Sequence, residues 1–343
     1  MACLCLLACG SGFYYFAPFA SDSTWQRQGT VISGMQEEEY SVQEPTVLYE
    51  GPSILFGKQQ SSVFKMWHTC GWSQGNICYA ESTDGSHFVR YNGGKPIISG
   101  TGRSFVLRLG TTYYLFTTQE VNGVAWDRYE SSDGIQWKLT FPRVLTLGSA
   151  PWEKVCGNIF VWIENSTWYA MYEAGSTDGT WRVGLATSPD GISWTKNATN
   201  PVISKPSCGG PEIHKINGTY YMWAQCSSQT RTIPDDIYRW RSNDLLTWTP
   251  EVVEIRRQTP DEGSPDNDQS QVADPSMVEV NGAVYLYYDA TPTQYPNSTG
   301  AIHIKVAVAK MNFSSLVKAP SSPNLPVDPA AVSLFISWRR KPR

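Results

Sequence analysis

The stretch that decides the fold is Val272-Ala-Asp-Pro-Ser-Met-Val-Glu-Val-Asn-Gly-Ala-Val-Tyr-Leu-Tyr-Tyr-Asp289. It reads as two β-strands joined by a tight turn at Asn281-Gly282, because Asn-Gly between alternating apolar runs is the strongest short hairpin signal. The first strand opens with Asp274-Pro275, and proline is tolerated at the start of a strand. The stretch therefore predicts a hairpin with a carboxylate at its mouth and an aromatic second strand.

The same pattern recurs along the chain. Each unit has a strand, a tight turn, an aromatic strand, a loop and a third strand, and many units continue with Ser-x-Asp-Gly-x-x-Trp, whose Trp begins a fourth, outer strand. The units follow one another at roughly 50–60 residues, a propeller-like period, and helical periodicity is absent. We therefore expect an all-β fold, a five-bladed β-propeller with four-stranded antiparallel blades. The five units cover residues 44–85, 104–137, 157–194, 210–248 and 272–309.

The ends of the chain differ in composition from the repeats. The propeller is expected over residues 40–318, after a leader at 1–39 and before a Pro/Ser-rich tail at 319–343. Leu6-Leu7-Ala8-Cys9 resembles a bacterial lipoprotein cleavage box, although no positively charged segment precedes it. This predicts a secreted or surface-attached protein, with a lipid anchor as one form of attachment. The alternative is an apolar tip without function.

Charge and hydropathy limit the classes of partner. The net charge is −4, and no basic run occurs before the C-terminal Arg339-Arg340-Lys341-Pro342-Arg343, so nucleic acid is not an expected partner. No apolar run approaches the roughly 20 residues that span a bilayer. The chain holds 14 Trp and 18 Tyr, which suit strands and also suit surfaces on which sugar rings stack. The oligomeric state is left open.

Five cysteines fall within the repeats. Cys208 and Cys226 lie nearly opposite each other across a predicted hairpin, so a bridge between them is geometrically plausible. Cys70 and Cys78 flank one short loop, and Cys156 is left over. Isolated buried thiols are the alternative. No Cys-x-x-Cys occurs, so zinc and thioredoxin-type sites are not expected.

The repeats resemble the five-bladed propeller glycosidases, in the broad group that includes glycoside hydrolase family 43. The resemblance spans nearly the whole globular part and implies cleavage of a glycosidic bond in an oligo- or polysaccharide by an inverting mechanism with three acids. Fructan-cleaving relatives usually carry an Asn-Asp-Pro-Asn-Gly opening and an Arg-Asp-Pro box, and neither occurs here. The motifs that carry the resemblance are Glu44-Pro45, Asp274-Pro275, Gly210-Pro211-Glu212, Asn217-Gly-Thr-Tyr-Tyr-Met-Trp223 and Ala186-Thr-Ser-Pro-Asp-Gly-Ile-Ser-Trp194.

Acids at the starts of the innermost strands converge on one axial funnel in such a fold. The first, fourth and fifth units carry Glu44, Glu212 and Asp274 there, and these blades are consecutive around a closed ring. Glycoside cleavage needs this composition, because one carboxylic acid protonates the leaving oxygen while another activates water, as in inverting enzymes, or attacks carbon, as in retaining ones. We assign Asp274 as general base, Glu212 as general acid and Glu44 as the carboxylate that positions or tunes the pair. The family's usual order of acids on successive blades is not kept, so an exchange of roles stays open, as does a purely structural role for Glu44 or Glu212.

Other residues are candidates for contacts with the substrate. Arg103 occupies the strand start of the second blade and can pair with a carboxylate in the funnel or with an acid group of the substrate. Trp67, Trp152 and Trp223 are candidates for sugar stacking, with packing inside the blades as the alternative. No His cluster has metal-site spacing, and no cofactor is required; a structural Ca²⁺ occurs in some related propellers. The acidic loop Thr259–Gln269 is expected to rim the funnel, or else to be a solvated loop.

Two other functions remain open from the residues alone. A noncatalytic carbohydrate-binding propeller would keep the aromatic funnel and would need no acid pair. A glycoside phosphorylase of similar fold would need a basic anion site beside the acids, and Arg103 is the evident candidate for such a site. The sugar, the linkage and the choice between exo and endo action do not follow from the sequence.

Overall fold

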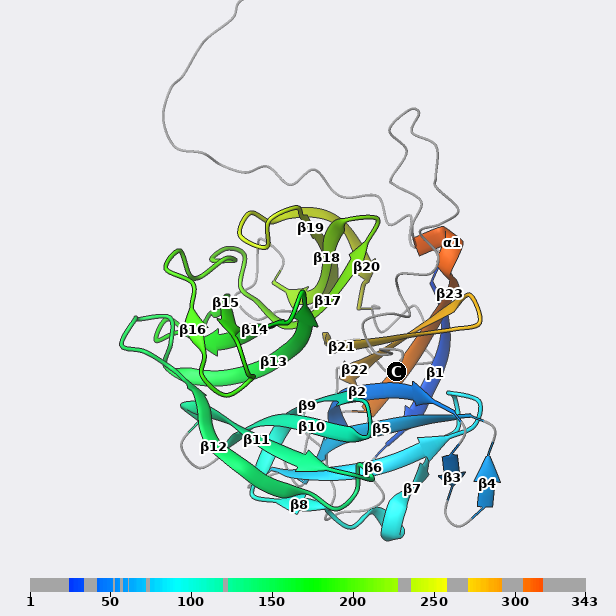
Figure 1. The fold of residues 1–343 in the computed structure, drawn as a ribbon. Helices are drawn as coiled ribbons and strands as arrows, with labels where there is room; N and C mark the ends of the chain where they lie inside the picture. Colours follow the sequence, from blue (N-terminus) through cyan, green and yellow to red (C-terminus); the bar gives the residue numbers. More distant parts are fainter. Residues whose placement is uncertain are drawn as a thin grey trace, which may run out of the picture.

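The protein is a ring of five small antiparallel sheets around one axis, which confirms the predicted five-bladed β-propeller (Figure 1). The structure is a computed structural model, and it describes residues 25–33, 42–51, 53–55, 58–60, 62–71, 75–119, 123–227, 236–257, 271–291 and 305–316. The expected tail, the lipoprotein-like segment and the acidic loop at 259–269 lie outside the described residues.

The first three blades follow the order of the chain. Blade 1 contains β2 (Val42–Glu50), β5 (Val63–Cys70), β6 (Asn76–Ser82) and β7 (Val89–Arg90), with β8 (Ile98–Ser99) pairing on β6 and η1 (Tyr91–Gly94) between them. A separate hairpin is formed by β3 (Ser53–Leu55) and β4 (Lys58–Gln60). Blade 2 contains β9 (Thr101–Leu109), β10 (Thr112–Gln119), β11 (Ala125–Ser131) and β12 (Lys138–Thr146). Blade 3 contains β13 (Val155–Glu164), β14 (Thr167–Gly175), β15 (Trp181–Ser188) and β16 (Thr195–Lys196).

The last two blades complete the ring. Blade 4 contains β17 (Cys208–Ile216), β18 (Thr219–Cys226), β19 (Asp236–Ser242) and β20 (Thr249–Ile255). Blade 5 contains β21 (Gln271–Val280), β22 (Ala283–Thr291), β23 (Lys305–Asn312) and, as its outer strand, β1 (Gln26–Ile32); α1 (Phe313–Leu316) follows β23. The innermost strands β2, β9, β13, β17 and β21 pack beside one another around the axis.

The outer strand of blade 5 comes from the beginning of the chain. β1 pairs antiparallel with β23, so the two ends of the repeat array are joined in one sheet. The expected boundary at residue 40 is therefore wrong: the propeller begins no later than Trp25, whose buried indole packs in the core shared by blades 4 and 5. This pairing closes the ring, because a strand from the start of the chain completes the last blade.

The hairpin that suggested the fold has the expected turn. Asn281 and Gly282 adopt φ of 53° and 80°, and Val280 pairs with Ala283 across the turn. Positive φ at both positions matches the twist of the flanking strands, and glycine reaches it without steric cost.

The Asp of the repeated Ser-x-Asp-Gly motif, and Asp244 in the corresponding Ser-Asn-Asp-Leu of blade 4, have a structural role. In four blades an Asp side chain accepts backbone N–H groups from two and three residues further along, which fixes the turn between the third and fourth strands. The turn of blade 2 also packs on blade 1, because the indole N–H of Trp67 donates to the carbonyl of Gly134 at 2.7 Å. The four turn acids are Asp84, Asp133, Asp190 and Asp244.

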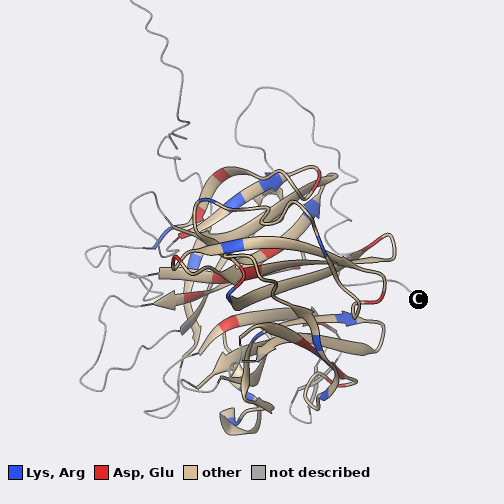
Figure 2. Cartoon of the chain, turned by 90° about the vertical axis from the view of Figure 1, so that its left-hand side faces the viewer, with Lys and Arg blue, Asp and Glu red and all other residues tan. Residues whose placement is uncertain are grey.

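Two disulfides lie within the described blades. Cys208 and Cys226 are bridged across the β17–β18 hairpin, and Cys70 and Cys78 are bridged across the β5–β6 hairpin. Cys156 is a buried free thiol. Figure 2 shows acidic and basic positions interspersed over the blades rather than gathered into one basic face. Within the described part of the chain, no helix has the length and apolar character needed to cross a bilayer.

Candidate active site

A β-bulge at the start of each innermost strand points side chains at the axis. Each of these strands has two residues facing one residue of its neighbour at this point. A bulge bends its strand and re-aims a side chain, and bulges are common beside active sites. In four blades the first bulge residue has positive φ: Glu44 (58°), Arg103 (54°), Gly210 (55°) and Asp274 (50°).

Each of these four bulges is held by the blade that precedes it. The backbone N–H of the bulge residue donates to a side-chain oxygen that lies on the second strand of the preceding blade. This recurring contact fixes the bulge residues relative to one another, because it joins adjacent blades at the axis. The four donations run from Arg103 to Thr69 (2.8 Å), from Gly210 to Glu173 (3.1 Å), from Asp274 to Gln225 (2.9 Å) and from Glu44 to Asp289 (2.9 and 3.1 Å).

The structure brings the three expected acids to one place. Glu44, Glu212 and Asp274 all line a small cavity of about 30 Å³ at the starts of the inner strands. They come from blades 1, 4 and 5, which are consecutive around the closed ring. The convergence expected from the sequence is therefore found, although their chemical roles stay predictions.

Asp274 is the most strongly engaged of the three. Its Oδ1 accepts hydrogen bonds from Nδ2 of Asn158 at 2.5 Å and from Nε2 of Gln225 at 2.9 Å. Burial and the negative charge of Glu44 raise the pKa of Asp274 to about 6, against the lowering effects of Asp289, Arg103 and Gln225. A carboxylate with this pKa is ionised near neutral pH and still basic enough to take a proton, as a general base must be.

Glu44 is paired with Arg103. Nε of Arg103 donates to Oε1 of Glu44 at 3.0 Å, and Nη1 donates to the carbonyl of Cys156 at 2.5 Å. The guanidinium also lies over the ring of Trp181, 5.6 Å from its centroid. Arg103 thus holds Glu44 beside the cavity, as the sequence suggested that it could.

Glu212 occupies a different register from the other two acids. The bulge residue of β17 is Gly210, so Glu212 lies two residues further along, level with Thr46 and Ser276 in their blades. Its Oε1 accepts hydrogen bonds from Nε2 of His214 at 2.7 Å and from the backbone N–H of Met277 at 3.1 Å. Glu212 is nevertheless one of the residues that line the small cavity.

Two further acids of the site were missed. Glu173 on β14 and Asp289 on β22 are buried on second strands, where their carboxylates accept the N–H groups of the bulges. Burial and the charge of Asp274 raise the pKa of Glu173 to about 7. Burial and the adjacent Asp274, to which it is hydrogen-bonded, hold the pKa of Asp289 well above its ordinary range. The available signal was a lone carboxylate near the end of an aromatic strand, in Met171-Tyr-Glu173 and Tyr287-Tyr-Asp289.

Glycines make room for these carboxylates. A Cβ at Gly210 would lie 2.1 Å from Oε1 of Gln225 and 2.8 Å from Oδ1 of Asp274. Since Gly210 also has a φ of 55°, any side chain there is strained.

We expect Gly210→Ala to lower kcat/KM by about tenfold or more, because the added methyl group displaces Gln225 and with it Asp274. Steady-state kinetics alongside thermal unfolding measure this, with Gly218→Ala in the exposed β17–β18 turn as a control for adding a methyl group at a glycine of positive φ. Equal activity of Gly210→Ala and wild type would contradict the geometry.

The expected tryptophans divide into two groups. Trp67 and Trp223 are 0% exposed and belong to the blade cores, so no ring face is left for a sugar; this corrects their assignment as stacking residues. Trp152 is half-buried, with its ring stacked on Tyr172 at 5.8 Å. Trp181, which was not singled out, is half-buried and contacts Arg103. It is the better candidate for a sugar-facing ring, because it reaches the residue that holds Glu44.

A structural Ca²⁺ would need six to eight oxygen ligands. Among the described residues no group of three or more His, Cys, Asp or Glu is arranged to hold a metal ion. Water and backbone carbonyl oxygens also serve as Ca²⁺ ligands, so the structural Ca²⁺ stays a prediction.

No family model matches the chain. No curated protein matches it either. Solved structures do match along most of their length. A structure from the GH130 family, described as mannoside phosphorylases that include hydrolases of β-1,2-mannosidic linkages in Candida mannan, has a TM-score of 0.60 at 16% identity and covers 92% of this chain and 99% of its own.

Two further matches have the same architecture. A β-1,2-mannobiose phosphorylase from Listeria innocua has a TM-score of 0.61 at 12% identity, covering 86% of this chain and 98% of its own. A family 117 glycoside hydrolase from the marine bacterium Zobellia galactanivorans has a TM-score of 0.58 at 14% identity, covering 90% and 97%. At these identities the likeness establishes the fold, that of five-bladed propeller glycoside hydrolases and phosphorylases.

Proposed function

We propose that this chain is a glycoside hydrolase that cleaves a glycosidic bond by carboxylate general acid/base catalysis. The observation that carries the proposal is the meeting of Glu44, Glu212 and Asp274 at one axial cavity, with the pKa of Asp274 raised to about 6 by burial and by Glu44. Carboxyl groups gathered at one cavity, one to donate a proton and one to accept it, are what glycoside cleavage requires.

The proposed reaction uses each acid once. Asp274 takes a proton from water while the water oxygen bonds to the anomeric carbon, and the bond from that carbon to the leaving oxygen breaks as Glu212 donates a proton to this oxygen. Glu44, held by Arg103, raises the pKa of Asp274 and favours the positive charge that develops on the sugar ring. Water attack opposite the leaving group inverts the anomeric configuration, in keeping with the resemblance to family 43.

Hydrolysis is favoured over phosphorolysis by the charges at the cavity. Among the described residues, no Lys or Arg lines the acid cavity, and Arg103 beside it is engaged by Glu44 and by the carbonyl of Cys156. A phosphate co-substrate would need a basic site there. A purely carbohydrate-binding propeller is disfavoured by the buried acids at the hub. Burial raises the pKa of Glu173, Asp274 and Asp289, and this costs stability for which sugar binding alone gives no reason.

We propose the cellular location of the protein from its disulfides. Two disulfides within the described blades favour an oxidising environment, since cytosolic thiols are kept reduced. This supports a secreted or surface-attached protein that acts on external glycans.

The proposal is tested by assaying the wild type on aryl glycosides of arabinofuranose, xylose, galactose and mannose and on β-1,2-linked mannose disaccharides. Each assay is run with and without inorganic phosphate, and the anomer first formed is identified by NMR. We expect phosphate-independent release of a sugar of inverted configuration. Turnover only with phosphate would identify a phosphorylase, and glycan binding without any turnover would identify a carbohydrate-binding protein.

A further inference from the structure

Two cavities lie along the propeller axis. The small cavity, at the starts of the inner strands, holds the three acids, and a second cavity of about 360 Å³ is lined by the later parts of the same strands. Phe105 and Phe160 line both, and their ring centroids are 4.6 Å apart, so they form a layer between them. The exposed turn at Asn281-Gly282 lines the second cavity, which therefore reaches the surface.

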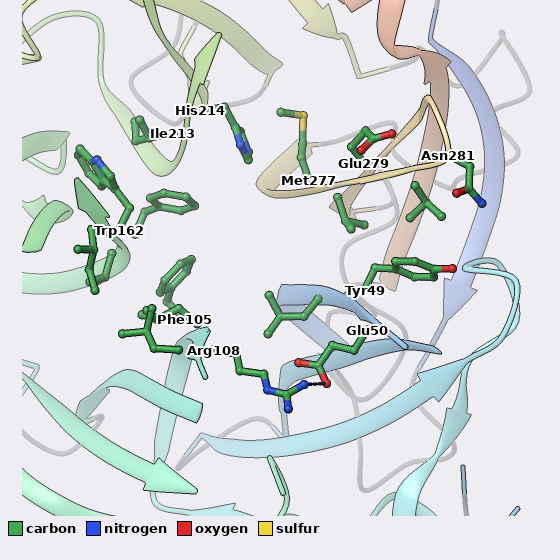
Figure 3. A pocket seen from close by; sticks show the side chains of 18 of the residues that line it. Tyr49, Glu50, Phe105, Arg108, Trp162, Ile213, His214, Met277, Glu279 and Asn281 are labelled. Carbon is green, nitrogen blue, oxygen red and sulfur yellow. Dashed lines mark ion pairs between the residues drawn. The ribbon is translucent and has the colours of Figure 1, made fainter. Parts of the chain in front are cut away.

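One pair of side chains joins the two cavities. Glu212 lines the small cavity and His214 lines the large one, and Nε2 of His214 lies 2.7 Å from Oε1 of Glu212. Their side chains are only 3% and 10% exposed. Figure 3 shows the ring of His214 pointing into the large cavity, across from Phe105.

The proposed reaction requires a route by which Glu212 regains a proton after each turnover. Each turnover leaves Asp274 with one proton more and Glu212 with one proton fewer. Glu212 is buried beside the small cavity, and in the proposed complex a sugar at the mouth of that cavity covers the acid from that side. Its proton must therefore be restored by a route other than the substrate mouth if restoration is to keep pace with product release.

We propose that His214 is a proton relay that reloads Glu212 from the large cavity. A protonated His214, with a proton on each ring nitrogen, passes the proton on Nε2 to Oε1 of Glu212 and is left neutral with its proton on Nδ1. Nε2 then regains a proton from a hydronium ion that enters through the large cavity, so no other reactant is needed. The cavity has room for several water molecules. His214 acts through Glu212 and does not touch the substrate, and the proposal rests on the hydrolase function proposed above.

The surroundings of His214 suit this role. Phe160 of β13 and Trp223 of β18 pack on its ring at centroid distances of 6.1 and 5.9 Å, which fixes it against Glu212. Glu212 is hydrogen-bonded to it, and Tyr221 lies opposite on β18. The charged groups that share the large cavity with it are Glu50, Arg108 and Glu279.

The test replaces His214 in the full chain and measures kcat, KM and the pH dependence of kcat. His214→Gln keeps a donor to Glu212 but cannot carry a proton, so we expect kcat to fall by about tenfold or more with KM within about twofold. In His214→Ala we expect kcat to fall by a similar factor. Added imidazole should restore activity, because it fits the space that the side chain leaves in the cavity. The rescue should weaken as pH rises through about 7, because imidazolium is the donor. Pyrazole, of equal size but hardly protonated near neutral pH, should not rescue.

The control is His87→Gln, which changes an exposed histidine of an outer turn and should leave kcat unchanged. Wild-type turnover together with full activity of His214→Gln would overturn the relay and leave the hydrolase function standing. Rescue of His214→Ala by pyrazole as well as by imidazole would also overturn it, since filling the space would then suffice. A wild type without turnover on any glycoside would overturn both proposals.

Discussion

Asp274→Asn is expected to lower kcat by about a thousandfold while sugar binding persists. The amide keeps the size of the side chain and can still face Asn158 and Gln225, but it cannot take a proton from water. Steady-state kinetics on the best substrate give kcat, and calorimetric titration with the product sugar gives binding. Loss of both would point to a displaced site rather than to a missing base.

The pH dependence of kcat/KM of the wild type tests the role of Asp274 as general base independently. As the pKa of Asp274 is raised to about 6, kcat/KM should fall as the pH drops below about 6, where the base becomes protonated. The residual rate of Asp274→Asn should lack this acidic limb. Asp178→Asn, in the exposed turn between β14 and β15, serves as the control and should keep both the rate and the limb. A full rate with Asp274→Asn would exclude Asp274 as the base.

The second large effect concerns stability. The pKa of Glu173 is raised from 4.5 to about 7, first by burial and then by the charge of Asp274. A folded state that binds the proton more tightly than the unfolded chain is most stable below the ordinary pKa, and this contribution is lost as pH rises through the folded value. Ionised Glu173 therefore costs about 3 kcal/mol of unfolding free energy above pH 7 relative to pH 4.5.

Glu173→Gln removes this dependence and still offers an oxygen to the N–H groups of Asn158 and Gly210. We expect the variant to gain on wild type by up to about 3 kcal/mol between pH 5 and pH 8. Urea unfolding with the disulfides intact measures the difference at each pH. Glu130→Gln, on a more exposed carboxylate of blade 2, controls for the loss of a negative charge. If the free energy of unfolding changed with pH in the same way for Glu173→Gln and wild type, Glu173 would stay ionised in the folded protein.

The local pattern determined the repeat and its number. Turn pairs such as Asn281-Gly282, aromatic second strands and Asp-Gly turns depend on neighbours in the chain, so they can be read from the sequence. The same pattern placed Glu44 and Asp274 at strand starts, and ring closure then implied that they meet. It could not show β1 as the outer strand of blade 5, because that pairing joins segments nearly 280 residues apart by β-sheet contacts alone.

Only the tertiary structure decided how the acids are arranged and charged. Glu173 and Asp289 act across blade boundaries, on N–H groups that no neighbouring residue reveals, and their raised pKa values come from burial that the ring creates. The register of Glu212, two residues past its bulge, depends on where the strand departs from regular pairing. Local sequence patterns therefore predicted that Glu44 and Asp274 stand at strand starts. Proton affinity and mutual placement arise instead from contacts between residues that are distant in the chain.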